Sequence, residues 1–493
     1  PDPGQTPAER FRSMSARSPR VIFATIILVF ISEGAVLGYS LVSYALPYIT
    51  QDLHTTQGGW LITAYTLSGA VIAPLVGKLG DTYGKRRIML YCLSIGLVGA
   101  ILATWSPSMA VLIVGRILQG VVGPTMFMAY SLVRDVFPKA AVPIVTAITM
   151  TGTGVFAVGF PALLGWLLDG YGFRALFALD IVWIAALIPI LRYAIPETDI
   201  RNRMRVDGFG ALLITLGVGG VLAGISLGSG QWGWLDGRTV AAIAGGIVLL
   251  VVFGVYSRRV AEPVIDVRVF KTRPVLVALT TGCMATAVVS GYSIMSSLIG
   301  QTPIELGGDY GVGLTASAYA WVIVPQTLTT VVFGMVAGAL AKKTGALVVM
   351  QIGLVFLIGS CLMVGFVVGT SHPLLLASGL LFGVGNGMSY GAIPTLALAG
   401  ATRETRATTV SMVQTGTSIF GSIVPILMYV ILNANANITD EAIAYSAHAF
   451  RLNAVFMVAL LAIALVASLT VLRRTREQTL PLVEVDDPDP ARA

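Results

Sequence analysis

Long apolar stretches, separated by short polar segments, run through nearly the whole chain. Each is long enough for a helix to cross a hydrocarbon core about 30 Å thick. Of the 493 residues 56% are hydrophobic and only 11% are charged, which is too apolar for a water-soluble domain of this size. The pattern predicts an all-α membrane protein with fourteen transmembrane helices, at 21–46, 58–77, 88–105, 109–132, 143–167, 174–194, 208–227, 239–257, 274–299, 313–340, 346–368, 373–398, 408–432 and 451–472.

Lys and Arg are concentrated in every second connecting segment, and the exceptions are Arg116, within a span, and Arg174, Arg238 and Arg451. Because basic residues stay on the cytoplasmic side, both termini are predicted to be cytoplasmic, in a multi-pass protein of the plasma (inner) membrane. The net charge of +7 is therefore a topological signal, and we expect some of these residues to contact anionic lipid headgroups. No basic stripe alternates with aromatic residues, which argues against nucleic acid as a partner.

The spans divide into two halves of six, because the pair 208–227 and 239–257 lies between them. We predict two six-helix bundles in a pseudo-twofold arrangement, with two extra helices inserted between them. Repeated halves are what a transporter needs if it rocks about a site near the membrane midplane. The predicted segments are a cytoplasmic tail, the first bundle, linkers with the extra helices, the second bundle and a cytoplasmic tail, at 1–20, 21–194, 195–273, 274–472 and 473–493.

The loop from Gly77 to Arg87, between the second and third spans, carries the most specific motif, GKLGDTYGKRR. Five ionic side chains between two membrane-length segments must lie at a water interface, and the glycines permit a tight turn. We predict a conformational latch, in which Asp81 caps a neighbouring helix N-terminus or pairs with basic groups of other spans. The alternative is a topology signal alone. The latch residues are Gly77, Asp81, Gly84, Lys85, Arg86 and Arg87.

The G-x-x-x-D-x-x-G-[RK]-[RK] spacing of this loop resembles the same loop in the major facilitator superfamily. The R-x-x-Q-G sequence at 116–120 resembles that family's fourth span, and Ala45-Leu46-Pro47 resembles the end of its first. The fourteen-span layout is similar to the drug:proton antiporter group and covers essentially the whole chain. The resemblance implies a proton-coupled secondary transporter, which exports hydrophobic or amphipathic small molecules by alternating access.

The chain also departs from this group at several places, one of which is Asp180, where many relatives have Asn. The acid that the group usually carries in span one is replaced by Gly38, and an acid appears instead at Glu33. The antiporter pattern of span five is reduced to Pro161 and Gly165, which we take as a bend in that span. The weakened pattern favours an alternative of the same fold, an importer or a carrier that translocates lipids or lipid-like molecules.

Three ionisable residues within spans are candidates for proton coupling. Glu33 lies near the middle of span one, where a charge costs about 3 kcal/mol or more unless it is paired, hydrated or neutralised. Arg116 in span four needs an acid, carbonyl groups or water beside it, and the resemblance makes Glu33 its expected partner. Asp180 in span six is the third candidate. For each residue the alternative is a purely structural hydrogen bond or ion pair.

The expected substrate cavity is lined by aromatic, Met and neutral hydrogen-bonding residues. Helical spacing places part of span four on the face of Arg116, and the resemblance brings in spans nine and twelve. Close helix packing is the alternative for small hydroxyl residues on these spans. The predicted lining residues are Gln119, Phe127, Tyr130, Tyr292, Met295, Asn386 and Tyr390.

Other functional classes find little support in the sequence. No His, Cys or acidic cluster has catalytic or metal-binding spacing, so we expect neither an enzyme nor a metal site. No Gly-rich phosphate-binding loop is present, so a proton gradient, rather than a cofactor or nucleotide, is the expected energy source. The three cysteines all fall within spans and are read as small apolar residues. The expected partners are a small hydrophobic or amphipathic substrate, protons and membrane lipids, and the expected state is a monomer.

Overall fold

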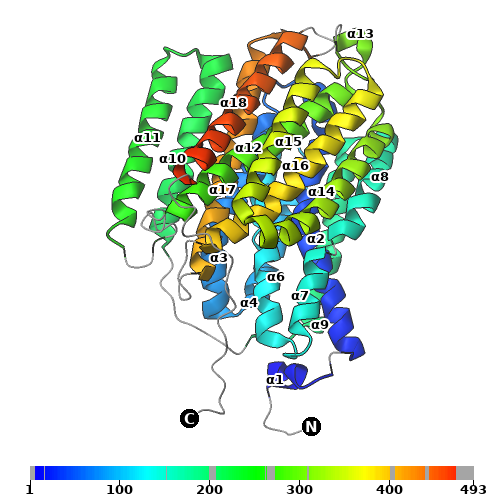
Figure 1. Ribbon diagram of the computed structural model, residues 1–493, viewed down its shortest axis with the longest axis vertical. Coiled ribbons are helices and arrows are strands. Elements are labelled where there is room, and N and C mark those ends of the chain that lie inside the picture. The colour runs from blue at the N-terminus through cyan, green and yellow to red at the C-terminus, as the bar shows by residue number, and fades with distance from the viewer. Residues whose placement is uncertain are drawn as a thin grey trace.

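A computed structural model describes residues 6–15, 17–151, 153–198, 207–260, 263, 273–307, 310–399, 406–438 and 443–472. The predicted tail 473–493 and the linker stretches 199–206 and 264–272 lie outside these residues. The chain forms an elongated bundle of helices, with α1 at one end and α13 at the other (Figure 1). These two ends are called the α1 end and the α13 end below.

In the first half the structure describes a short first helix and eight further helical segments: the predicted fourth span is divided between α5 and α6, and the predicted fifth span is described in two parts, on either side of residue 152. Thr6 and Glu9 form a capping box at the start of this short helix. The helices are α1 (Pro7–Arg12), α2 (Pro19–Asp52), α3 (Gly59–Tyr83), α4 (Lys85–Thr104), α5 (Met109–Gly120), α6 (Thr125–Val136), α7 (Val142–Thr151), α8 (Thr153–Tyr171) and α9 (Phe173–Ala194).

The two inserted helices and the second half follow. A π-helical turn (Gly228–Trp232) separates the inserted pair, and a short antiparallel hairpin pairs Ala436 with Tyr445 near the end of the chain. The elements are α10 (Gly208–Leu227), α11 (Gly237–Ser257), α12 (Arg273–Gln301), α13 (Ile304–Gly307), α14 (Ala316–Thr344), α15 (Ala346–Phe366), α16 (His372–Ala399), α17 (Arg406–Asn433), β1 (Ala436–Ile438), β2 (Ile443–Tyr445) and α18 (Ala447–Leu472).

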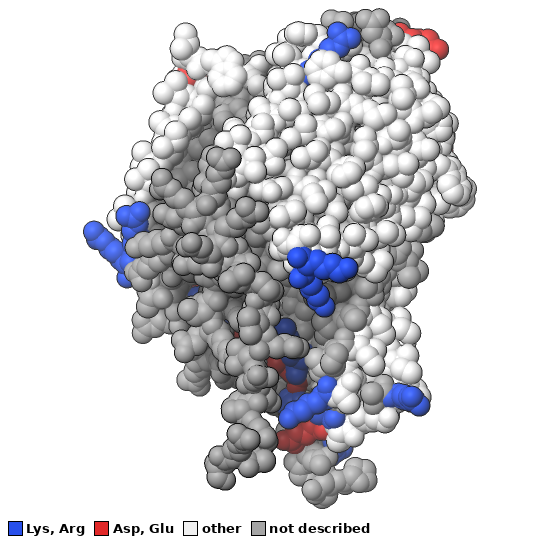
Figure 2. All heavy atoms as spheres, viewed as in Figure 1, with Lys and Arg blue, Asp and Glu red and all other residues white. Residues whose placement is uncertain are grey.

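Twelve helical segments among the described residues are long and apolar enough to cross a membrane, counting Met109–Val136 as one. The protein is therefore a multi-pass membrane protein. Helix α8 and helix α16 lie where the fifth and twelfth spans were predicted. The total of fourteen spans stays a prediction. On the face shown in Figure 2, the part of the molecule between the upper rim and mid-height is mostly free of described charged residues, and most of these lie from mid-height downward.

The fourth predicted span, 109–132, is interrupted rather than continuous. Main-chain hydrogen bonds at residues 121–125 join each N–H to the carbonyl three residues earlier, which tightens the helix locally. Pro124 lacks an N–H group and cannot continue the normal pattern. Gly120, just before the break, lies so close to α3 that a Cβ there would be 2.3 Å from the Tyr65 carbonyl oxygen.

The two halves share a local feature at equivalent places. Helix α3 ends at Gly84, which has φ +107°, and helix α14 ends at Gly345, which has φ +87°. Positive φ is accessible to glycine at little cost, and in each half the next helix begins one residue later. The pseudo-twofold relation between whole bundles stays a prediction.

Candidate functional site

The two halves of the molecule make polar contacts near the α13 end. Thr63 of α3 donates a hydrogen bond to the main-chain oxygen of Ser422 in α17 at 2.7 Å. Gln301, the last residue of α12, donates one to the main-chain oxygen of Tyr44 in α2 at 3.2 Å. Because α13 follows α12 directly, these contacts lie toward that end (Figure 1). The structure therefore shows a conformation whose halves are joined at the α13 end.

A cavity of about 100 Å³ lies between α2 of the first half and α12 and α14 of the second. The Tyr44 hydroxyl and the Gln326 Oε1 are buried and have no hydrogen-bond partner among the described residues. Buried polar groups normally have partners, so these two are available to a guest molecule or water. The cavity is lined by Tyr39, Ser40, Ser43, Tyr44, Ser293, Ser296, Tyr319, Ile323 and Gln326, none of which carries a charge.

Glu33 is buried in the middle of α2, with 1% of its surface exposed. Its Oε1 has no hydrogen-bond partner among the described residues. Tyr130 of α6 lies close enough to interact with it electrostatically and also faces Ser32. No ion pair in the part of the chain that the structure describes includes Glu33.

Arg116 is fully buried at the centre of a hydrogen-bond network in the first half. Its Nη1 donates to Gln119 Oε1 at 2.9 Å, and Gln119 Nε2 donates to Asp180 Oδ2 at 2.8 Å. Its Nε donates to the main-chain oxygen of Leu61 at 3.1 Å, and its guanidinium lies 4.4 Å from the centre of the Tyr65 ring. The buried positive charge is therefore balanced by a carboxylate that it reaches through an amide.

The expected pairing of Arg116 with Glu33 is wrong in this conformation. No ion pair joins the two within the described residues, and Asp180 provides the opposite charge instead. Gln119 lies one helical turn after Arg116 and links it by hydrogen bonds to Asp180 of α9. The structure thus separates the two candidate acids, with Asp180 in the network and Glu33 outside it.

The motif loop is braced by carboxylates on both sides. Lys85, the first residue of α4, is only 8% exposed. Its Nζ lies 3.2 Å from Asp81 Oδ1 and 2.5 Å from Asp135 Oδ2, and it donates to Ser131 Oγ at 2.6 Å. Three elements, α3, α4 and α6, are therefore joined at one lysine.

Glu197, just after α9, caps the start of α4. Its carboxylate accepts hydrogen bonds from the main-chain N–H groups of Arg86 at 3.0 Å and Arg87 at 2.9 Å. An acid in this place is stabilised by the helix dipole and by the unpaired N–H groups of the first turn. A Cβ at Gly84 would lie 2.6 Å from the Glu197 Cδ, so the position requires glycine for space as well as for φ.

All of these loop partners belong to the first half. Asp81 pairs with Lys85, which is the first residue of α4 and itself part of the motif loop. A Cβ at Gly77 would meet nothing within 4 Å, so packing does not demand glycine there. The latch role of the loop stays a prediction.

The residues predicted to line the substrate cavity do not all meet in this conformation, although Tyr130 lies within electrostatic reach of Tyr390. Gln119 belongs to the Arg116 network. Tyr292 and Met295 are fully buried, and the Tyr292 ring stacks on Phe382 with centroids 4.1 Å apart. Tyr390 is 59% exposed. Phe127 is also exposed, whereas Tyr130 and Asn386 are half-buried. None of the predicted set lines the cavity between α2, α12 and α14.

Pro161 and Gly165 both lie within helix α8. Gly165 is a contact position, because a Cβ there would be 2.7 Å from the Ala316 carbonyl oxygen at the start of α14. The bend predicted for this span remains a prediction.

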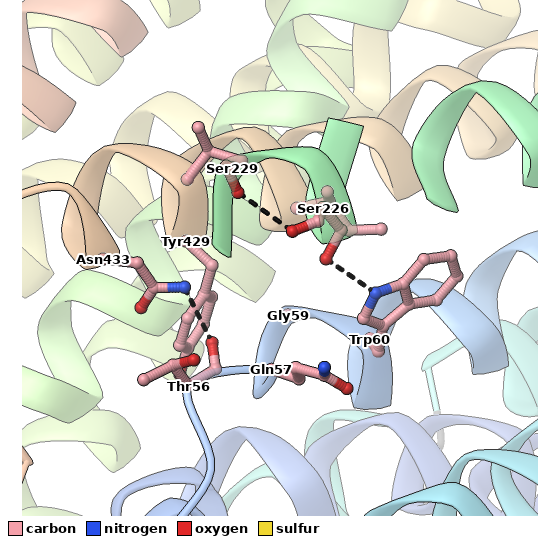
Figure 3. Close-up of a pocket in the computed structure, with 10 residues that line it drawn as sticks. Thr56, Gln57, Gly59, Trp60, Ser226, Ser229, Tyr429 and Asn433 are labelled. Carbon is pink, nitrogen blue, oxygen red and sulfur yellow. Dashed lines mark hydrogen bonds between the residues drawn. The ribbon is translucent and has the colours of Figure 1, made fainter. Parts of the chain in front are cut away.

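A second and much smaller cavity, about 10 Å³, lies at the α13 end where α10 meets α3 and α17. Trp60 donates a hydrogen bond to Ser226 Oγ at 2.9 Å, and Asn433 donates one to the main-chain oxygen of Thr56 at 3.0 Å (Figure 3). The space holds at most one water molecule. It marks a packing contact between the inserted helices and both halves.

The sequence model of the Major Facilitator Superfamily matches residues 28–324 and 294–490. The chain belongs to the Major Facilitator Superfamily. A crystal structure of the peptide transporter POT in complex with sulfate superposes with a TM-score of 0.68 at 17% identity, covering 96% of this chain and 99% of that one. This likeness shows that the fold is that of superfamily transporters.

Curated relatives in the superfamily are transporters rather than enzymes. The chain is 26% identical to a uridine/deoxyuridine transporter of Lactococcus lactis over 77% of this chain and 79% of that one. It is 28% identical to the multidrug resistance protein Stp of Mycobacterium tuberculosis over 74% and 67%. It spans 45% of the length of an uncharacterised transporter of M. tuberculosis, to which it is 29% identical. The chain is thus a transporter of the superfamily.

Sequence reasoning missed two groups of site residues. Asp135 and Glu197 brace the motif loop, and both follow predicted spans, where acids are easily read as solvated. The cavity residues Tyr39, Ser43 and Tyr44 form a polar stripe at helical spacing on span one, and this spacing is the sequence signal for them.

Proposed function

We propose that this protein exports small hydrophobic or amphipathic molecules by alternating access, driven by the proton gradient. The proposal assigns it to the fourteen-span drug:proton antiporter group, with both termini cytoplasmic and the α13 end facing outward. The observation that carries it is the uncharged cavity between the halves. Aromatic faces and neutral hydrogen-bonding groups suit apolar guests with a few polar atoms, and they tolerate variety in such guests.

The cavity lies where a rocking motion would expose it. Residues of α2 form one wall and residues of α12 and α14 form the other, so movement between the halves changes the access to it. In this conformation the α13 end is joined by Thr63, Ser422, Gln301 and Tyr44. Export then requires that these contacts separate to release the substrate outward.

Glu33 is the residue that we assign to the proton. It is buried, and no ion pair among the described residues includes it, so its carboxyl is free to exchange a proton when water reaches it. In the proposed cycle it gains a proton from the outer side, the substrate leaves, the halves rock, and the proton departs inward. One charge that moves through 100 mV yields about 2.3 kcal/mol. At roughly 150 mV one proton therefore sustains a substrate gradient of a few hundred fold.

The test is efflux of Nile red, a neutral lipophilic dye, from loaded cells that express the protein. We expect faster efflux than from cells with an empty vector, and loss of the difference when an uncoupler collapses the proton gradient. A Glu33→Gln variant should reach the membrane in the same amount but lose the gradient-driven component. Equal efflux with and without the protein, for a panel of such dyes, contradicts the proposal.

Import of a small neutral solute is the second candidate. A relative named as a uridine/deoxyuridine transporter favours it, and a cavity of hydroxyl and amide groups also suits a nucleoside. Uptake of labelled uridine into cells, compared with empty-vector cells, tests this directly. Movement of a fluorescent lipid between vesicle leaflets tests the related lipid carrier, and either result without dye efflux reverses our assignment.

A further inference from the structure

One contact between the halves at the α13 end joins a carboxylate to a helix start. Asp169, in the last turn of α8, accepts hydrogen bonds from the main-chain N–H groups of Ala316 and Ser317, each at 2.9 Å. Ala316 is the first residue of α14. An acid of the first half therefore caps a helix of the second half.

This contact completes the hydrogen bonding at the start of α14. The first N–H groups of a helix have no partner within it. Thr315 supplies two acceptors. Its side-chain oxygen accepts a hydrogen bond from the Ala318 N–H at 3.2 Å, and its main-chain oxygen accepts one from the Tyr319 N–H at 2.9 Å. The N–H groups of Ala316 and Ser317 depend on Asp169. The positive end of the helix dipole adds an attraction for the carboxylate.

The surrounding residues hold Asp169 in place. Gly165, one turn earlier in α8, lets the start of α14 approach until a Cβ would be 2.7 Å from the Ser317 Cα. Tyr48 of α2 donates a hydrogen bond to Asp169 Oδ1 at 3.4 Å from within the same half. The carboxylate is thus positioned from its own half and directed at the other.

We propose that Asp169 is a gate residue, whose carboxylate on the start of α14 holds the α13 end closed. Opening of this end replaces two hydrogen bonds and the charge–dipole attraction with contacts to water. The contact of Asp169 with the start of α14 therefore favours the closed conformation. The inference rests on the proposed alternating access, but neither on the identity of the substrate nor on proton coupling. A distance measurement therefore tests it separately from a transport assay.

The experiment measures the distance across the α13 end by pulsed electron paramagnetic resonance on purified protein. Spin labels are placed at Ser108→Cys and His372→Cys, which are exposed positions of opposite halves at this end. The three native cysteines are buried and should remain unlabelled. The variants to compare are Asp169→Asn, which keeps one acceptor and loses the charge, and Asp169→Ala, which loses both.

We expect the longer-distance population to rise relative to the shorter one, by about 10-fold in Asp169→Ala, which corresponds to about 1.4 kcal/mol, and by less in Asp169→Asn. The matched control is Asp52→Asn. Asp52 is a surface acid of the same end, but its partner Arg174, at 3.5 Å, belongs to the same half. Distances unchanged in both Asp169 variants, when gel filtration shows folded protein, overturn the inference. An equal shift in the control also overturns it, because the effect would then be a general loosening.

Discussion

The Asp180–Gln119–Arg116 network predicts a coupled loss of stability when either charge is removed. Two hydrogen bonds of 2.9 and 2.8 Å joined by one amide place the opposite charges roughly 8 Å apart. At an effective dielectric constant of about 20, Coulomb's law gives an attraction of about 2 kcal/mol. Asp180→Asn keeps the size of the side chain and removes the charge, and it leaves a fully buried Arg116 without a counter-charge.

The assay is thermal unfolding in detergent of the wild type, Asp180→Asn, Arg116→Gln and the double variant. Each single substitution should destabilise the protein by about 2 kcal/mol or more, and the double variant should be less damaged than the sum by about 2 kcal/mol. Asp52→Asn is the control, because its half-exposed ion pair contributes about 1 kcal/mol at most. Additive effects at Asp180 and Arg116, or an equal loss in the control, refute the reasoning.

Four further substitutions test the remaining features by unfolding or transport. Gly84→Ala should destabilise the protein more than Gly345→Ala. Both substitutions place alanine at a positive φ, but only the new Cβ at position 84 also clashes with the Glu197 side chain. Equal losses of stability would mean that this clash is relieved at no cost. Gly77→Ala should be neutral or should stabilise α3 by up to about 1 kcal/mol, and a clear loss would reveal a contact made in another conformation. Glu33→Gln should keep wild-type stability, because it removes no ion pair, while dye efflux loses its response to an imposed pH gradient.

The positions of the long helices were accessible from the sequence because they depend on properties local to the chain. Apolar length needs no knowledge of neighbours, and the positive φ of Gly84 fits a short loop between long helices. The interruption at Pro124 could also have been predicted, because a proline within a span is a local signal for a break; counting apolar residues alone does not reveal it. The helix there had been predicted to continue because its neighbours are apolar on both sides.

The partners of the charged residues were not accessible in the same way. Asp180 follows Arg116 by more than sixty positions, and which acid meets a buried guanidinium depends on helix rotation and tilt. The same holds for Glu197, whose role as a cap arises only when α9 ends beside the start of α4. Residue type indicated that such partners must exist, and only the packing identified them.

The place of α10 gives the molecule two unlike flanks. Its apolar residues, Leu213, Ile214 and Val218 among them, pack in one cluster with residues of α3 and α17, over the line where these two helices meet. The opposite meeting line, between α8 and α14, has no such cover among the described helices. For an apolar molecule that diffuses laterally within the bilayer, the α3–α17 flank is therefore shielded by protein, whereas the α8–α14 flank is exposed to acyl chains. Lateral exchange between the lipid and the interior of the protein would then be easier on the α8–α14 flank.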